Sequence, residues 1–124
     1  MPDPVVVVIP GRPLPLANSR LHWAARMRLV RDRSGLAQVI AQGVRRGAPV
    51  AKDRRKVEAT IYLSGVPFDP DGAVSSIKPE LDGICRAGLL RGDRPQDIEL
   101  TVTQRKAASR KEQRVVWTIE GMSE

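Results

Sequence analysis

Hydrophobic side chains recur along this chain with two different periods, and the order of these periods constrains the fold more than any other feature. Four segments of strand length alternate apolar and polar residues or form a short apolar run, and two longer segments repeat apolar residues three to four positions apart. In chain order, the predicted elements span residues 4–10, 20–46, 56–64, 75–88, 98–102 and 115–119. This β-α-β-α-β-β order predicts an α/β (α+β) fold, a small mixed β-sheet of about four strands with two helices packed on it.

Local signals leave two alternatives for the helices. Ser34 and Gly35 lie in the middle of the first helical segment, which is therefore predicted as one long helix or two shorter ones. In the second segment Pro79 lacks a backbone N–H donor, and proline is tolerated mainly in the first turn of a helix. The second helix is therefore predicted to begin between Ser75 and Lys78, or to be kinked there.

Length and composition define the class of protein. The 124 residues suffice for a single domain, residues 1–124, and scarce aromatic residues leave the core to valine, isoleucine, leucine and alanine. Trp23 and Trp117 both fall on apolar stripes and are predicted to join that core; the alternative is that they stack on nucleic-acid bases. The chain has one cysteine, Cys85, and one histidine, which excludes an internal disulfide and a zinc site with four Cys or His ligands. Cys85 is predicted to be a small core residue. Without a long apolar run or a signal-peptide pattern, we expect a cytoplasmic protein with no membrane partner.

Basic residues are in excess and unevenly distributed. The formal net charge is +7, and residues 12–56 carry twelve basic residues against two acids, a balance of +10. In residues 57–104 the charge balance is negative, with four basic residues against eight acids. Residues 105–114 hold five basic residues and are predicted to form a hairpin loop. The excess favours a polyanionic partner such as nucleic acid, and acids concentrated within a basic protein suggest a bound metal ion.

Asp69-Pro70-Asp71 is the clearest candidate for chemistry. The backbone around Pro70 is predicted to be extended, so that two aspartates two positions apart aim at one point. Two adjacent carboxylates need a cation or a proton between them, and Mg²⁺ is bound by one or two carboxylates together with waters and substrate phosphates. The alternative is a plain surface turn, because Asp, Pro and Gly are all common turn residues.

Two further charged residues follow in the chain. Lys78 either neutralises charge on a phosphate in a transition state or forms a surface pair with Asp82, four residues further along. Asp93 lies beyond the second predicted helix, and it joins Asp69 and Asp71 only if the chain doubles back beside that helix.

Taken together, these residues resemble the RusA family of Holliday junction resolvases. The order of the predicted elements and the chain length also fit, so the resemblance covers nearly the whole chain. The stretches that carry it are Asn18-Ser19-Arg20-Leu21-His22-Trp23 with Arg26, Asp69-Pro70-Asp71 with Lys78 and Leu81-Asp82-Gly83, and Ala87-Gly88-Leu89-Leu90 leading to Asp93.

The resemblance implies a Mg²⁺-dependent homodimer, with Mn²⁺ as a possible substitute, that places paired symmetric nicks in four-way DNA junctions. It implies a phage or prophage enzyme of DNA recombination and repair. Asp69, Asp71 and Asp93 match the family's metal-binding acids, and with Lys78 they form the implied catalytic set. The residues expected to contact DNA are Asn18, Arg20, His22, Arg26, Arg105, Lys106, Arg110 and Lys111.

Two positions depart from the family pattern and keep other functions open. Gly72 stands where the family usually has Asn, and Gly92 stands where it often has a second Asp. The alternative function is therefore a catalytically inactive nucleic-acid-binding module of the same fold. A basic interaction protein unrelated to DNA is a third possibility, and it predicts no steep salt dependence of DNA affinity.

Overall fold

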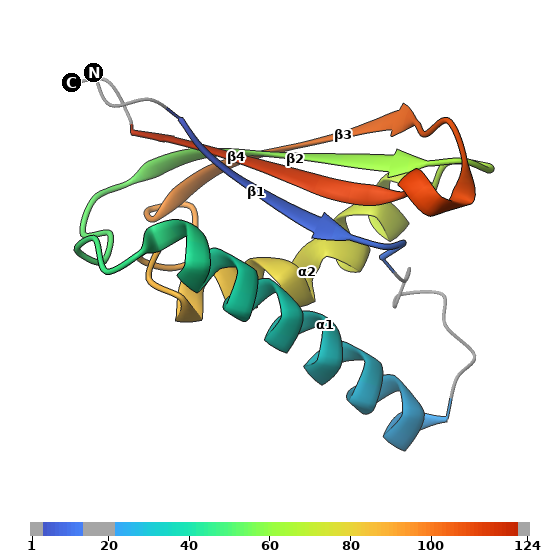
Figure 1. Ribbon diagram of the computed structural model, residues 1–124, viewed down its shortest axis with the longest axis horizontal. Coiled ribbons are helices and arrows are strands. Elements are labelled where there is room, and N and C mark those ends of the chain that lie inside the picture. The colour runs from blue at the N-terminus through green and yellow to red at the C-terminus, as the bar shows by residue number, and fades with distance from the viewer. Residues whose placement is uncertain (1–3, 14–21, 122–124) are drawn as a thin grey trace.

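The computed structural model describes residues 4–13 and 22–121, which form two layers, a β-sheet and a pair of helices against one of its faces (Figure 1). The fold class and the order of elements predicted from the sequence are confirmed. The elements are β1 (Val5–Pro10), α1 (Trp23–Arg45), β2 (Arg55–Leu63), α2 (Pro70–Arg86), β3 (Ile98–Lys106), the short 3-10 helix η2 (Arg110–Glu112) and β4 (Arg114–Gly121).

The sheet has the strand order β1-β4-β2-β3. β2 pairs in parallel with β3 and antiparallel with β4, and β4 pairs antiparallel with β1. The prediction of a hairpin over residues 105–114 is wrong, because β3 and β4 lie on either side of β2. The connection between them crosses the end of β2, where the Ala107 N–H donates to the Leu63 carbonyl over 2.9 Å.

α2 begins earlier than the sequence predicts, at Pro70, and Pro79 lies inside it. Proline is well suited to the first helical position, where an N–H has no partner within the helix. Asp69 caps the helix by accepting from the Gly72 N–H. The cost of Pro79 is offset by packing, because α2 buries a continuous apolar face that includes Ala73 and Ile77.

α1 is one helix of 23 residues rather than two. It passes so close to α2 that a Cβ built on Gly83 would lie 2.2 Å from the Ser34 carbonyl oxygen. Gly83 therefore sets the distance between the two helices, and Ser34 lies in this contact rather than at a break. Neither α1 nor α2, nor any other helix within 4–13 and 22–121, is long and apolar enough to cross a membrane.

The core lies between the sheet and the helices and is aliphatic, as predicted. Trp117 is fully buried in it. The prediction for Trp23 is wrong: it is 73 % exposed at the first turn of α1, beyond the area that the sheet covers. Cys85 is half-buried against the core, and burial, with a smaller effect of nearby acids, raises the pKa of its thiol to about 12.

A buried carboxylate connects the two layers. Glu80 of α2 is fully buried, and its two oxygens accept from Trp117 Nε1 at 2.9 Å and from Arg33 Nε at 3.0 Å. The Arg33 guanidinium also donates to the carbonyls of Pro10 and Gly11, at the end of β1. Burial raises the pKa of Glu80, and Arg33 and Trp117 oppose that shift.

We predict that Arg33→Met destabilises the fold more at high pH than at low pH. Without Arg33 the pKa of Glu80 rises further, so the folded state binds a proton that the unfolded state releases, and stability falls as pH rises between the two values. Breaking a buried ion pair costs ~3–5 kcal/mol, and this loss is expected near pH 8. Urea unfolding at pH 5 and pH 8 measures the difference.

The double variant Arg33→Met/Glu80→Gln is the control, because it has no carboxylate to titrate at this position. It should therefore lack the additional loss of stability between pH 5 and pH 8 that Arg33→Met shows. An equal loss at both pH values for Arg33→Met alone would contradict the prediction.

Candidate functional site

Asp69 and Asp71 lie together in the first turn of α2, at the end of the molecule where β2 ends. The predicted extended backbone at Pro70 is wrong, because residues 70 and 71 are already helical. Asp69 Oδ1 accepts from the Gly72 N–H at 2.6 Å, whereas Asp71 is exposed in the first turn. A Cβ built on Gly72 would meet the same Asp69 oxygen at 2.6 Å, so glycine leaves room for this cap.

The residue before this pair is fixed to β3 by a glutamine side chain. Gln104 Oε1 accepts from the Phe68 N–H at 2.8 Å, and Gln104 Nε2 donates to the Phe68 carbonyl at 2.9 Å. Arg12 lies over the Phe68 ring, 5.2 Å from its centroid. Sequence reasoning missed Gln104, although a polar residue that continues the core-facing series Ile98, Leu100, Val102 was a usable signal.

Lys78 lies on the same side of α2 as Asp71. Seven residues are close to two turns of helix, so its Cα lies about 10 Å further along the axis. Lys78 is exposed. The alternative pair between Lys78 and Asp82 is not formed; Asp82 instead bonds Arg86 at 2.8 Å.

Asp93 lies at the opposite end of the domain from Asp69. It precedes β3, whose first residue pairs with the first residue of β2, whereas Asp69 follows the end of β2. Nine strand residues span roughly 30 Å, so the chain does not double back beside the helix. Nowhere in the described part of the chain do three His, Cys, Asp or Glu side chains gather to hold a metal ion.

A buried aspartate, Asp97, explains why position 92 is a glycine rather than the second Asp of the family pattern. Asp97 is 7 % exposed, and its carboxylate accepts from Arg91 Nε at 2.8 Å. A Cβ on Gly92 would approach the Asp97 Oδ2 to 2.3 Å. An acid at position 92 would therefore clash with this ion pair, and sequence reasoning did not find Asp97.

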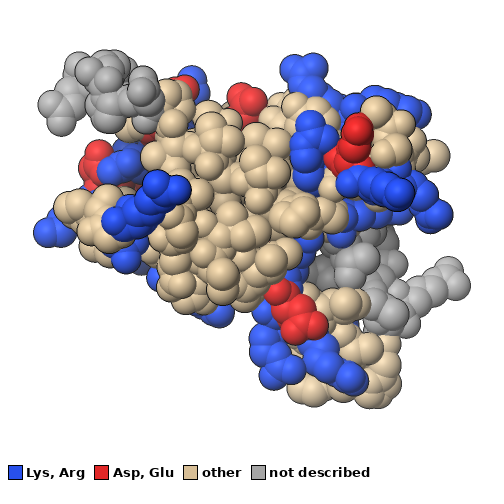
Figure 2. Space-filling model, viewed as in Figure 1, with Lys and Arg blue, Asp and Glu red and all other residues tan. Residues whose placement is uncertain are grey.

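The predicted DNA-contacting residues of the last connection lie at the same end as Asp69. Arg105 and Lys106 end β3, and Arg110 and Lys111 lie in η2. Figure 2 shows lysine and arginine side chains gathered over this end of the sheet. A shallow hollow of about 160 Å³ lies beside them, lined by Leu63, Gly65, Pro67, Gln104, Arg105 and Lys106.

The predicted contacts near the N-terminus are only partly within the described residues. Asn18 and Arg20 lie outside them. His22 caps α1, its Nδ1 accepting from the Ala24 N–H at 3.2 Å, and Arg26 lies one turn further along. A hollow of about 340 Å³ is lined by Trp23, Ala24, Met27, Arg28 and Arg31.

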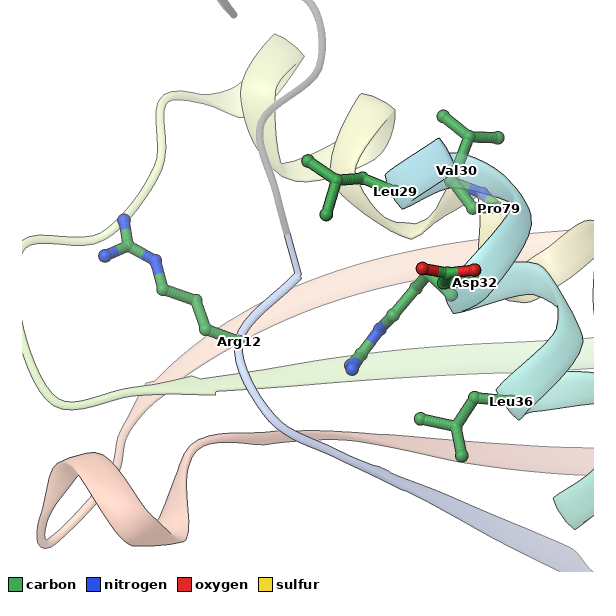
Figure 3. A pocket seen from close by; sticks show the side chains of 7 residues that line it. Arg12, Leu29, Val30, Asp32, Leu36 and Pro79 are labelled. Carbon is green, nitrogen blue, oxygen red and sulfur yellow. The ribbon is translucent and has the colours of Figure 1, made fainter. Parts of the chain in front are cut away.

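A separate hollow of about 380 Å³ lies between α1, Pro79 of α2 and the residues that follow β1 (Figure 3). It contains none of the predicted acids. Its lining is mainly apolar, and the Arg33 side chain that reaches it also bonds Glu80. The lining residues are Arg12, Leu29, Val30, Asp32, Arg33, Leu36 and Pro79.

No protein-family model matches this sequence, and no curated protein matches it either.

We predict that Asp69→Asn leaves the fold almost as stable as the wild type, whereas Asp69→Ala costs ~1 kcal/mol. Asn has a side-chain oxygen that accepts from the Gly72 N–H, and Ala does not. Urea unfolding of the three proteins measures the difference. Equal losses for both variants would contradict the role of Asp69 as a cap, and a stable Asp69→Asn supplies a well-folded protein without the charge.

Proposed function

We propose that this chain is a Mg²⁺-dependent, structure-selective endonuclease that resolves four-way DNA junctions by paired symmetric phosphodiester hydrolysis, as RusA-type Holliday junction resolvases do. The observation that carries the proposal is the first turn of α2. There Asp69 and Asp71 are both exposed within one helical turn, at the end of the domain where arginine and lysine side chains gather.

This pair suits Mg²⁺, which is commonly bound by one or two carboxylates with waters and substrate phosphates completing the octahedron. Asp69 Oδ1 accepts a hydrogen bond from the Gly72 N–H. Oδ2 of Asp69 and both carboxylate oxygens of Asp71 are left to coordinate the metal ion. When bound, the ion supplies Lewis-acid polarisation of the phosphate and a water of lowered pKa. Mn²⁺, which takes the same ligand types, is the expected substitute.

The remaining charged residues bind and orient the DNA. Lys78, two turns along α2 on the side of Asp71, offsets charge that develops on the phosphate. Arg105, Lys106, Arg110 and Lys111 hold flanking phosphates, which gives affinity without reading the base sequence. Trp23, exposed beside Arg26, offers a surface on which an unpaired base at a junction can stack.

The substrate requires two such sites. A four-way junction has two equivalent strands to be cut in step, and a two-fold homodimer presents two identical sites. Asp93 lies too far from Asp69 in the same chain to share one ion with it, so the proposal assigns the ion to Asp69 and Asp71.

A second function is favoured by one observation, the lack of a three-acid cluster within 4–13 and 22–121. A module that binds branched DNA without cutting needs the basic surface and no metal. It predicts that removing the charge of Asp69 leaves DNA affinity unchanged or higher, because a carboxylate repels phosphate.

The test is a synthetic four-way junction incubated with the protein in Mg²⁺ and in EDTA, beside a linear duplex. We predict paired symmetric nicks that require Mg²⁺. Asp69→Asn and Asp71→Asn should each lower cutting ~100-fold or more, because the ion supplies several kcal/mol of transition-state stabilisation. Asp32→Asn, an exposed aspartate on α1, is the matched control and should cut at the wild-type rate.

Tight junction binding without nicks in either Mg²⁺ or Mn²⁺ would contradict the nuclease and favour the binding module. Junction affinity that does not fall as salt rises would contradict both, because phosphate contacts release counterions.

A further inference from the structure

β1 forms one edge of the sheet, and no strand within 4–13 and 22–121 pairs with its outer side. The strand order β1-β4-β2-β3 gives β1 a single neighbour, β4 (Figure 1). An edge strand presents a row of backbone N–H and C=O groups to which a further strand can be added. The outer side of β1 is therefore a candidate docking site for an extended segment.

The pairing register determines which backbone groups of β1 point outward. The Gly11 N–H donates to the Gln113 carbonyl over 2.9 Å, in register with the pairs along β1 and β4. Bonded positions alternate along an antiparallel pair, so the odd-numbered residues of β1 bond β4 and the even-numbered residues point away from it. Val6 and Val8 thus direct two N–H and two C=O groups outward.

This outer side ends at Pro10 and lies next to α1. Pro10 has no N–H, and its outward carbonyl accepts from Arg33 of α1 at 2.6 Å. A strand added to β1 would therefore bond Val6 and Val8 and would run between β1 and α1 toward Pro10.

Charges protect the opposite edge of the sheet but not this one. The other edge strand, β3, carries Glu99, Arg105 and Lys106, and charged side chains on an edge discourage pairing with another chain. β1 has four valines and an isoleucine over residues 5–9 and no charged side chain. The middle of the view in Figure 2 likewise shows no lysine, arginine, aspartate or glutamate side chain. An uncharged, β-branched edge of this kind favours strand addition.

An apolar stripe of α1 lies beside the outer side of β1. Leu29 and Leu36 line the hollow of about 380 Å³ together with Arg12, which follows β1 (Figure 3). Their side chains are partly exposed, and Val39, one turn beyond Leu36, is 68 % exposed. Alternate side chains of a strand point to the same face, so every second side chain of an added strand would lie on this stripe.

The end of the groove near this hollow is basic. Arg12 lines the hollow, and Arg28 and Arg31 line the neighbouring hollow on α1. Asp32 is the one acid in the lining, and the charge of Arg33 is balanced by its buried ion pair. Positive charges therefore outnumber negative ones here, which favours a partner with acidic residues at this end.

We infer that the outer side of β1, with the apolar stripe of α1 beside it, binds an extended segment of another protein as an additional strand of the sheet. The segment bonds the outward groups of Val6 and Val8 and lays alternate apolar side chains on Leu29 and Leu36. It carries acidic residues at the end that lies near Arg12. This surface is separate from Asp69 and Asp71, and the inference does not depend on the proposed nuclease.

Hydrogen exchange measured by NMR tests the inference with a synthetic peptide, Val-Thr-Val-Thr-Val with two glutamates at each end. In the free protein the amides of Val6 and Val8 should exchange faster than those of Val7 and Ile9, which donate to β4. At about ten times its dissociation constant, the peptide should slow exchange at Val6 and Val8 ~10-fold, because exchange then requires the free state. The same peptide with lysines in place of the glutamates should bind several-fold more weakly.

Two pairs of variants separate strand addition from general stickiness. Val8→Pro removes an outward N–H and no bond to β4, and it should raise the dissociation constant of the peptide ~10-fold or more. Val8→Thr keeps the N–H and the β-branched shape and should bind as the wild type does. Leu36→Asp should also weaken binding, whereas Val66→Asp, at an 84 % exposed valine after β2, should not. Thermal unfolding confirms that each variant folds.

No added protection of the Val6 and Val8 amides at ~1 mM peptide would overturn the inference, because the affinity would then be negligible. Equal binding by Val8→Pro and Val8→Thr would overturn it as well. A lysine-flanked peptide that binds equally well would contradict the acidic partner. A free protein in which Val6 and Val8 are already protected, within a dimer that Val8→Pro dissociates, would assign this edge to a second copy and would also overturn the inference.

Discussion

The buried carboxylate of Glu80 is the interaction on which the arrangement of both layers depends. A fully buried acid is costly unless its oxygens are paired, and this one is paired by Trp117 of β4 and Arg33 of α1. Because Arg33 also bonds the end of β1, one network joins both helices to two neighbouring strands. The network fixes the rotation of α2 about its axis, and therefore which of its residues face solvent.

That rotation determines the candidate site. With Glu80, Ala73 and Ile77 directed inward, Asp71 and Lys78 are directed outward on the other side of α2. The N-terminal end of the helix is fixed separately, by the Asp69 cap. The acidic pair is thus held by rigid elements at the basic end of the domain, the end at which the proposed function places the phosphate backbone.

The alternating segments were sufficient to predict the fold class, because periods of two and of 3.6 residues report directly which faces are buried. Two local predictions were wrong because tertiary contacts decide the outcome. α2 begins before Pro79 and tolerates it inside the helix because its apolar face is packed, and Trp23 is exposed because its apolar stripe extends beyond the sheet. The position of Asp93 relative to Asp69 could not be predicted from the sequence, because it depends on β3 pairing in parallel with β2. Gly72 and Gly92, read as departures from a family pattern, each make room for a neighbouring aspartate.

Titration of the ¹⁵N-labelled protein with Mn²⁺, followed by amide line broadening, tests the central claim most directly, because paramagnetic broadening reports where the ion resides without requiring activity. The account predicts that the amides of residues 69–72 broaden first, that Mg²⁺ reverses this, and that Asp71→Asn abolishes it while Asp32→Asn does not. Broadening that is uniform over the surface, or that begins elsewhere and leaves residues 69–72 sharp, would contradict a metal site at the start of α2.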